Sequence, residues 1–196
     1  GIIHWNGVEW STVASQTAET LRAVHGFEGS DVWAVGSLGT IMHLGAFGWH
    51  QVKVDPIPKS DGSMEQFIGQ LNAVWGASPD DVWAVGGTTG PVLLHWAGSE
   101  WASIPVDPLC TSQPLNGVWT APGEEVWVAG MAGTMGRWDG ERWDCADLLQ
   151  GDPLRVTPDF HAVWPGEDGE MLWFGGDFFV RGDNMFSLGR HGQGSA

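Results

Sequence analysis

The chain has 196 residues, 42% of them hydrophobic, and a formal net charge of −16. This size and apolar content suit one domain with a sizeable core, and no apolar run approaches the roughly 20 residues of a membrane span. Twenty-four acidic residues against eight basic ones exclude the basic surface that nucleic acids and anionic membranes attract. We therefore expect no nucleic-acid partner and no membrane insertion.

An internal repeat organises the sequence. The pattern Leu-x-Ala-Val begins at residues 21 and 71. A copy with Gly in place of Ala begins at residue 115, and one with Phe in place of Leu begins at residue 160, so successive copies are 50, 44 and 45 residues apart. Within residues 71–101, short apolar runs (LNAVW, VWAVG, VLLHW) are separated by turn residues (SPDD, TTG, AGSE). Each run is too short for a helix and long enough for a strand. The period fits the four-stranded antiparallel blades of a β-propeller.

The expected elements follow in chain order. We predict strands over residues 2–6, 9–14, 21–25, 31–36, 40–44 and 49–54, then onward at the repeat spacing, with almost no helix. Residues 1–15 form half a blade, complete blades span residues 21–70, 71–114 and 115–159, and a partial last blade spans residues 160–196. This count of about four and a half repeats in a single domain (1–196) favours five blades or an arc of a larger ring.

Tryptophan and histidine recur at fixed positions of the repeat. Most of the fourteen Trp residues fall at equivalent places, which indicates packing, because large aromatic side chains dominate core energetics. His4, His43 and His95 share one position of the third strand, where the next unit has Arg137. Equivalent positions lie about a blade width apart, too far to share a metal ion, so we expect a repeated hydrogen bond instead.

The two cysteines, Cys110 and Cys145, either form a disulfide or remain free thiols. Both follow fourth strands of neighbouring units. An extracytoplasmic protein would permit a disulfide. Their different distances from the preceding Trp leave the pairing open.

The repeat unit L-x-x-V-W-G-x-x-x-x-D-V-W-A-V-G-x-x-G-x-x-x-H-W-x-G-x-x-W resembles those of bacterial, myxobacterial-type propellers that are grouped with Asp-box (BNR) and photosystem II assembly factor-like propellers. Such repeats are common in surface and secreted proteins, which implies an extracytoplasmic location. The sialidase chemistry of the wider family uses a tyrosine nucleophile, and this chain has no Tyr. Sialidase activity is therefore disfavoured.

The two rims of the expected propeller differ. One rim carries short acidic turns, whose acids either keep the protein soluble or bind Ca²⁺ or a cationic partner. These acids are Glu28, Asp31, Asp80, Asp81, Glu124, Glu125, Glu167, Asp168 and Glu170. The other rim carries longer, irregular loops, where function is normally placed. At the channel mouth of that rim, the second residue of each first strand is polar, and the irregular segments contribute two cations. The predicted ligand-binding residues are Arg22, Asn72, Asn116, His161, Arg155 and Arg181.

Several classes of function fit this pattern. We favour a non-enzymatic, secreted or cell-surface propeller that presents a glycan-binding or protein-binding rim, without a cofactor except a Ca²⁺ ion that the acidic turns could hold. A glycosidase-like propeller is the first alternative; it needs two carboxylates about 5 to 9.5 Å apart, and the polar channel set contains none. A calcium-binding or copper-binding surface protein and an assembly scaffold are the others. The sequence does not identify the ligand or the oligomeric state.

Overall fold

The computed structural model of the protein describes residues 1–28, 31–55, 57–58, 64–145, 158–165, 171–177 and 185–189. Within these residues the structure is all-β, and the only helical element is a single 3-10 turn, Ser37–Gly39. The predicted all-β fold with almost no helix is confirmed for the described part of the chain. The strands predicted over residues 2–54 are also confirmed, with ends that differ by one or two residues.

The strands form separate antiparallel sheets. We call the three four-stranded sheets and the last, three-stranded sheet blades 1 to 4. A hairpin of β1 (Ile2–Trp5) and β2 (Trp10–Val13) precedes them. Blade 1 comprises β3 (Leu21–Gly26), β4 (Val32–Gly36), β5 (Ile41–Gly45) and β6 (Gly48–Val52). Blade 2 comprises β9 (Leu71–Ser78), β10 (Asp81–Gly86), β11 (Val92–Trp96) and β12 (Trp101–Ser103). Blade 3 comprises β13 (Leu115–Trp119), β14 (Val126–Gly130), β15 (Met135–Trp138) and β16 (Trp143–Cys145). Blade 4 comprises β17 (Asp159–Pro165), β18 (Met171–Asp177) and β19 (Met185–Gly189). A small ribbon of β7 (Ile57–Pro58) and β8 (Met64–Glu65) lies between blades 1 and 2.

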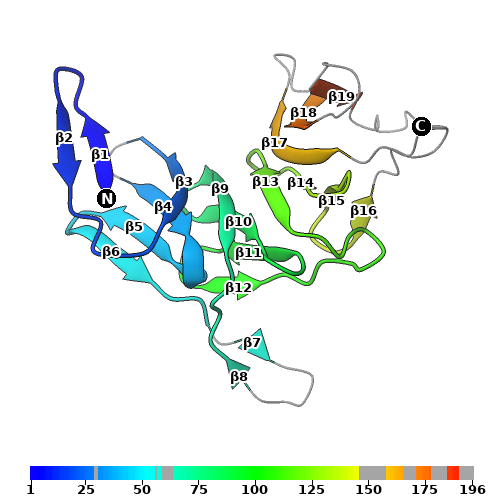
Figure 1. Cartoon of the computed structure of the whole chain (residues 1–196), viewed down its shortest axis with the longest axis horizontal. Helices are drawn as coiled ribbons and strands as arrows, with labels where there is room; N and C mark the ends of the chain where they lie inside the picture. Colours follow the sequence, from blue (N-terminus) through cyan, green and yellow to red (C-terminus); the bar gives the residue numbers. More distant parts are fainter. Residues whose placement is uncertain are drawn as a thin grey trace.

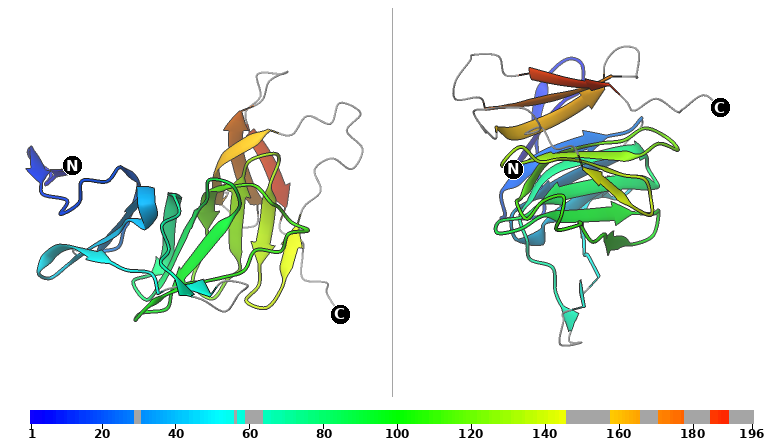
Figure 2. Two further views of the ribbon diagram at one scale, coloured as in Figure 1. Left: turned by 60° about the horizontal axis from the view of Figure 1, so that its bottom comes forward. Right: turned by 90° about the vertical axis from the view of Figure 1, so that its right-hand side faces the viewer.

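The blades stand side by side in chain order as an arc of a β-propeller (Figure 1). The β1–β2 hairpin lies at one end of this arc and blade 4 at the other (Figures 1 and 2). The first strands β3, β9, β13 and β17 are neighbours, and each contacts the next. The described sheets form an open arc, which fits the expectation of a partial ring.

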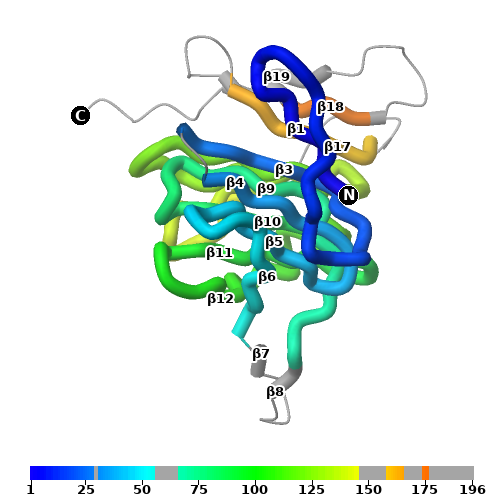
Figure 3. The backbone as a smooth tube through the Cα atoms, turned by 90° about the vertical axis from the view of Figure 1, so that its left-hand side faces the viewer, coloured from blue at the N-terminus to red at the C-terminus, as the bar shows by residue number. Residues whose placement is uncertain are grey.

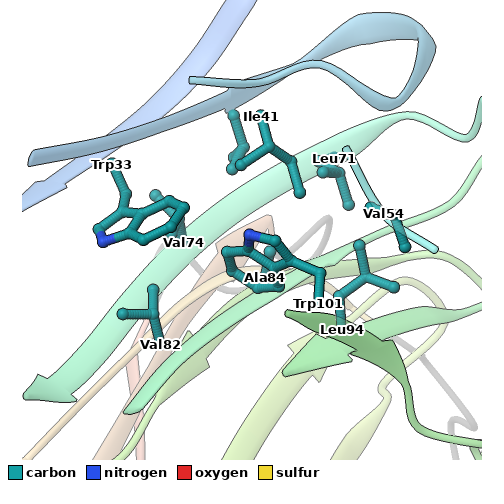
Figure 4. Packing of buried hydrophobic residues seen from close by; sticks show 10 residues of the cluster. Trp33, Ile41, Val54, Leu71, Val74, Val82, Ala84, Leu94 and Trp101 are labelled. Atoms are coloured by element: carbon teal, nitrogen blue, oxygen red, sulfur yellow. The ribbon is translucent and has the colours of Figure 1, made fainter. Parts of the chain in front are cut away.

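The hydrophobic core consists of three layers, one between each pair of blades. Trp33 and Val35 of blade 1 pack against Val82 and Ala84 of blade 2, with Trp101 beside them (Figure 4). The second layer joins blades 2 and 3, and the third joins blades 3 and 4. Successive residues of the second strands alternate between adjoining layers because side chains alternate across a strand. Both faces of these strands are therefore buried, which explains why VWAVG is apolar throughout.

A glycine stands at or next to the end of each second strand, because backbone at the start of the first strand passes directly against it. A Cβ atom on Gly36, Gly86 or Gly176 would overlap the carbonyl oxygen of Thr20, Gln70 or Asp159, respectively. Gly130 faces Pro114 in the same way. The final residue of the VWAVG pattern is thus set by a close backbone approach within each blade.

Candidate functional site

The polar residues predicted at the channel lie on the first strands of the blades, and the structure brings two of them together. The Asn72 Nδ2 atom on β9 donates to the Leu115 carbonyl oxygen on β13 at 2.9 Å and lies 3.2 Å from Asn116 Oδ1. The Asn116 Nδ2 atom in turn donates to the Phe160 carbonyl oxygen on β17 at 2.9 Å. Each asparagine therefore links its own blade to the next.

The other predicted site residues lie elsewhere on the first strands or outside the described residues. Arg22 is exposed on β3 at the open end of the arc, and His161 is exposed on β17. Arg155 and Arg181 lie outside the described residues. The ligand-binding role of all six remains a prediction, while the hydrogen bonds of Asn72 and Asn116 give these two residues a role between blades.

A second column of residues links the opposite ends of the first strands. The Trp75 Nε1 atom donates to the Thr120 carbonyl oxygen at 2.9 Å, which joins blade 2 to blade 3. The ring of His25 lies 4.4 Å from that of Trp75, and Trp164 contacts Trp75 edge-on at 5.0 Å. Burial lowers the pKa of His25 below its usual 6.5, and a hydrogen bond with the Gly76 backbone partly opposes this shift. A protonated His25 is thus disfavoured in the folded protein.

The histidine column forms the repeated hydrogen bond that the sequence predicts. His43 Nε2 lies 2.9 Å from Asp31 Oδ1 in blade 1, and His95 Nε2 lies 2.9 Å from Asp81 Oδ1 in blade 2. Each imidazole also stacks on the tryptophan of the second strand, with ring centroids 4.1 Å apart in blade 1 and 3.9 Å apart in blade 2.

Blade 3 keeps this arrangement with different residues. Arg137 pairs with Glu125 at 3.1 Å and lies over the Trp127 ring at 5.8 Å. A cation on an aromatic face and a carboxylate thus replace the stacked histidine and its aspartate. The column links the second and third strands in blades 1, 2 and 3.

Some acids of the acidic turns therefore already bind basic side chains within the protein. Asp31, Asp81 and Glu125 bind His43, His95 and Arg137. Glu28, Asp80 and Glu124 are exposed, and Glu167, Asp168 and Glu170 lie outside the described residues. Among the described residues, no three His, Cys, Asp or Glu side chains converge on a point that could hold a metal ion. In the same part of the chain, no helix is long and apolar enough to cross a membrane.

The long-loop rim, which we define as the side formed by the turns between second and third strands and the connections between blades, exposes apolar side chains. Their exposed fractions are 62% for Leu38, 63% for Ile68, 92% for Leu109 and 37% for Met131. The ligand-binding residues predicted on this rim are all polar, and these four apolar residues are not among them. The sequence feature that could have indicated them is a single apolar residue inside a turn-rich segment, such as Leu109 in VDPLCTSQP.

Covalent and hydrogen bonds brace this rim. Cys110, in the connection between blades 2 and 3, forms a disulfide with Cys145 at the end of β16, and their Cα atoms are 5.3 Å apart. Of the two alternatives for the cysteines, the structure shows the disulfide. The hydroxyl groups of Thr111 and Thr134 lie 2.8 Å apart, which links the same connection to the turn that follows Met131.

The turn of blade 1 is held in a similar way. The Gly39 backbone N–H donates to the Gly69 carbonyl oxygen at 2.7 Å, so the segments that carry Leu38 and Ile68 are neighbours. Leu109 N–H donates to Asp107 Oδ1 at 2.8 Å, which fixes the turn that carries Leu109. The exposed apolar residues of the long-loop rim therefore stand on ordered backbone.

Solved structures with a similar fold are β-propellers of low sequence identity. YCF48 from Cyanidioschyzon merolae matches 93% of this chain and 60% of its own, with a TM-score of 0.64 and 15% identity. The extracellular domain of the hybrid two-component system BT3049 from B. thetaiotaomicron matches 95% of this chain and 25% of its own, with a TM-score of 0.61 and 10% identity. The GH74 enzyme of Niastella koreensis matches 88% and 28%, with a TM-score of 0.60 and 12% identity.

These matches establish the propeller fold and nothing finer. The chain spans 60% of the length of the YCF48 chain. No protein-family model matches the sequence, and the search of curated proteins found no match.

Proposed function

We propose that this protein is a non-enzymatic binding propeller whose long-loop rim binds a protein ligand. The observation that carries the proposal is the set of exposed apolar side chains on this rim, namely Leu38, Ile68, Leu109 and Met131. Apolar side chains at the centre of a patch are typical of protein interfaces. Sugar sites, in contrast, would favour exposed aromatic rings and polar groups, and these four residues supply neither.

The bracing of the loops supports a binding role. A loop that is already ordered loses less conformational entropy when it binds, so more of the contact free energy appears as affinity. The Cys110–Cys145 disulfide and the Thr111–Thr134 hydrogen bond provide such order next to Leu109 and Met131. A disulfide also fits the oxidising environment outside the cytoplasm, which supports the proposal that the protein is secreted or displayed at the cell surface.

Charge defines the partner further. The formal net charge of −16 attracts basic partners over a Debye length of about 8 Å at physiological salt and speeds their association. The ligand we expect is therefore a protein segment with apolar anchors and flanking Lys or Arg residues. The asparagine column contributes to the rim by holding blades 2, 3 and 4 in register rather than by offering free amide groups.

Selection from a random peptide library displayed on phage tests this proposal. Peptides selected on the parent protein should bind Leu109→Asp at least tenfold more weakly, because the charge disrupts the apolar patch. The matched control Val8→Asp alters a residue that is 82% exposed in the β1–β2 turn, and binding there should be unchanged. Enrichment of no peptide, together with specific binding on a glycan array, would replace the protein ligand with a sugar.

A further inference from the structure

Two histidines face each other on the outer strands of blade 1. The register of β5 and β6, which follow β3 and β4 across the blade (Figure 3), places His43 directly opposite His50. Directly opposed residues of an antiparallel pair lie on the same face of the sheet, with Cβ atoms about 4.5–5.5 Å apart. The two imidazole rings accordingly have centroids 5.3 Å apart and meet at 68°. Blade 1 thus holds two imidazoles at a fixed separation.

The surroundings of this pair come from blades 1 and 2. His43 shares its face of β5 with Ile41, which belongs to the core layer between these blades. Trp33, on which His43 stacks, contacts two tryptophans of blade 2. The side chain of His43 is 19% exposed, whereas His50 is exposed to solvent. Packing therefore holds one imidazole in place, and the other has room to adjust to an incoming ion.

Hydrogen bonds determine which nitrogen of each ring can bind a metal ion. His43 Nε2 lies 2.9 Å from Asp31 Oδ1, and His50 Nδ1 lies 3.4 Å from the carbonyl oxygen of Gly48. An ionised carboxylate and a backbone carbonyl only accept hydrogen bonds, so these two nitrogens carry the protons. The lone pairs therefore lie on His43 Nδ1 and His50 Nε2. Metal-binding histidines almost always donate their other N–H in this way, which fixes the tautomer.

The two rings approach a common position beside Gly45. A Cβ atom on Gly45 would lie 3.8 Å from His50 Cε1 and 3.9 Å from His43 Cε1, and Cε1 is bonded to both nitrogens of its ring. Two imidazoles in adjacent positions of one ion, each bound at about 2.1 Å, have ring centres roughly 4.5–5.5 Å apart. The observed separation of 5.3 Å falls within this range.

The equivalent positions of the other units carry no second imidazole. The residues opposite the histidine column in the β1–β2 hairpin, blade 2 and blade 3 are Ser11, Ala102 and Asp144. His95 of blade 2 nevertheless makes the same carboxylate bond and the same stack on tryptophan as His43. The structural role of the column therefore needs no opposing histidine, and His50 adds a second nitrogen ligand to blade 1 alone among these units.

We propose that His43 and His50 form a binding site for a divalent ion of a late first-row transition metal, with Cu²⁺ bound most tightly. Imidazole nitrogen suits Cu, Zn and Ni rather than Ca or Mg, and Cu²⁺ leads the affinity order of these ions for a given site. Water molecules complete the coordination, so the site needs no third His, Cys, Asp or Glu side chain. The site is separate from the long-loop rim and does not depend on the protein ligand proposed there.

Calorimetric titration of Cu²⁺ into the protein in a non-coordinating buffer tests this proposal. His50→Ala removes one ligand at an exposed position and should weaken the tightest binding at least tenfold, while the melting temperature without metal stays unchanged. His95→Gln is the matched control, because it changes the equivalent histidine of blade 2, which faces Ala102. This control should bind Cu²⁺ as tightly as the parent.

Electron paramagnetic resonance gives a second measurement that does not depend on a variant. The spectrum of the parent with one equivalent of Cu²⁺ should show two nitrogen ligands, and that of His50→Ala should show one. Excess Ca²⁺ should leave the bound Cu²⁺ in place. Equal affinities of the parent and His50→Ala, a single nitrogen ligand in the parent, or displacement by Ca²⁺ would overturn the proposal.

Discussion

At the scale of single residues, Trp83 packs in the core layer between blades 2 and 3 and also contacts two residues of its own blade. It is 6% exposed, stacks on His95, and donates from Nε1 to Asp81 Oδ1 at 2.8 Å. We expect Trp83→Ala to lower the free energy of unfolding by about 3 to 5 kcal/mol. Trp10→Ala, at a 66% exposed site, is the control and should cost less than about 0.5 kcal/mol. Equal free energies of unfolding for the two variants in chemical denaturation would contradict the packing role of Trp83.

His25 makes stability depend on pH. Because burial lowers its pKa in the folded state below 6.5, protons bind the unfolded chain more readily than the folded one. The contribution of His25 to the free energy of unfolding is therefore complete above pH 6.5 and is lost as the pH falls below that value. Urea denaturation should show that the parent loses stability relative to His25→Gln as the pH falls from 7.5 to 5. The same difference at all pH values would refute this.

The asparagine column gives a third prediction. Asn116→Asp keeps the size of the side chain but removes the donor to the Phe160 carbonyl oxygen. Loss of one hydrogen bond typically costs about 0.5 to 1.5 kcal/mol, so thermal unfolding should shift to lower temperature. Gln113→Ala changes an exposed amide nearby and should have little effect. An unchanged melting temperature for Asn116→Asp would return this residue to the set of free ligand groups.

At the scale of the elements, we expect that the glycines near the ends of the second strands cannot be replaced by any larger residue without loss of stability. Gly86→Ala places a methyl group onto the Gln70 carbonyl oxygen, so the backbone of β9 or β10 must move. Overpacking of this kind costs about 1 to 3 kcal/mol or more. Gly175→Ala is a suitable control, because a Cβ atom there meets nothing within 4 Å. Comparable unfolding midpoints for the two variants would show that the strands do not approach as closely as described.

The Cys110–Cys145 disulfide stabilises the connection between blades 2 and 3 by joining it to β16. It closes a segment of 35 residues, and the chain-entropy model gives about 4 kcal/mol for a loop of this length. Cys110→Ser combined with Cys145→Ser should therefore lower the melting temperature, and reductant should have a similar effect on the parent. A titration that finds two free thiols in the non-reduced protein would show that the pair does not form.

At the scale of the whole molecule, the repeat predicted most of the fold because its chemistry is local. Short apolar runs and turn residues determine the strands, and the recurrence of Trp and Gly reflects contacts that each blade makes with itself or its neighbour. The histidine column was predicted for the same reason, since Asp31 and His43 belong to adjacent strands of one blade.

The candidate site was harder to predict because it depends on contacts between blades. The sequence shows that Asn72 and Asn116 are polar and equivalent, but only the packing of β9 against β13 shows that their amide hydrogens are already bound. Likewise, the exposure of Leu109 and Val24 depends on which surfaces are covered, and the repeat pattern does not contain this information. Val24 matches Val74 in sequence and differs from it only in what lies above it.

The central claim is that the long-loop rim is the surface that binds a protein ligand, and a hydrogen-exchange footprint tests it most directly. The parent protein would be measured with and without a peptide selected from the random library, and exchange would be followed by mass spectrometry. We predict slower exchange in residues 37–40, 66–70, 104–114 and 131–134, with no change in the turns at residues 97–100 and 139–142. A footprint confined to those short turns, or to the β1–β2 hairpin, would contradict the claim.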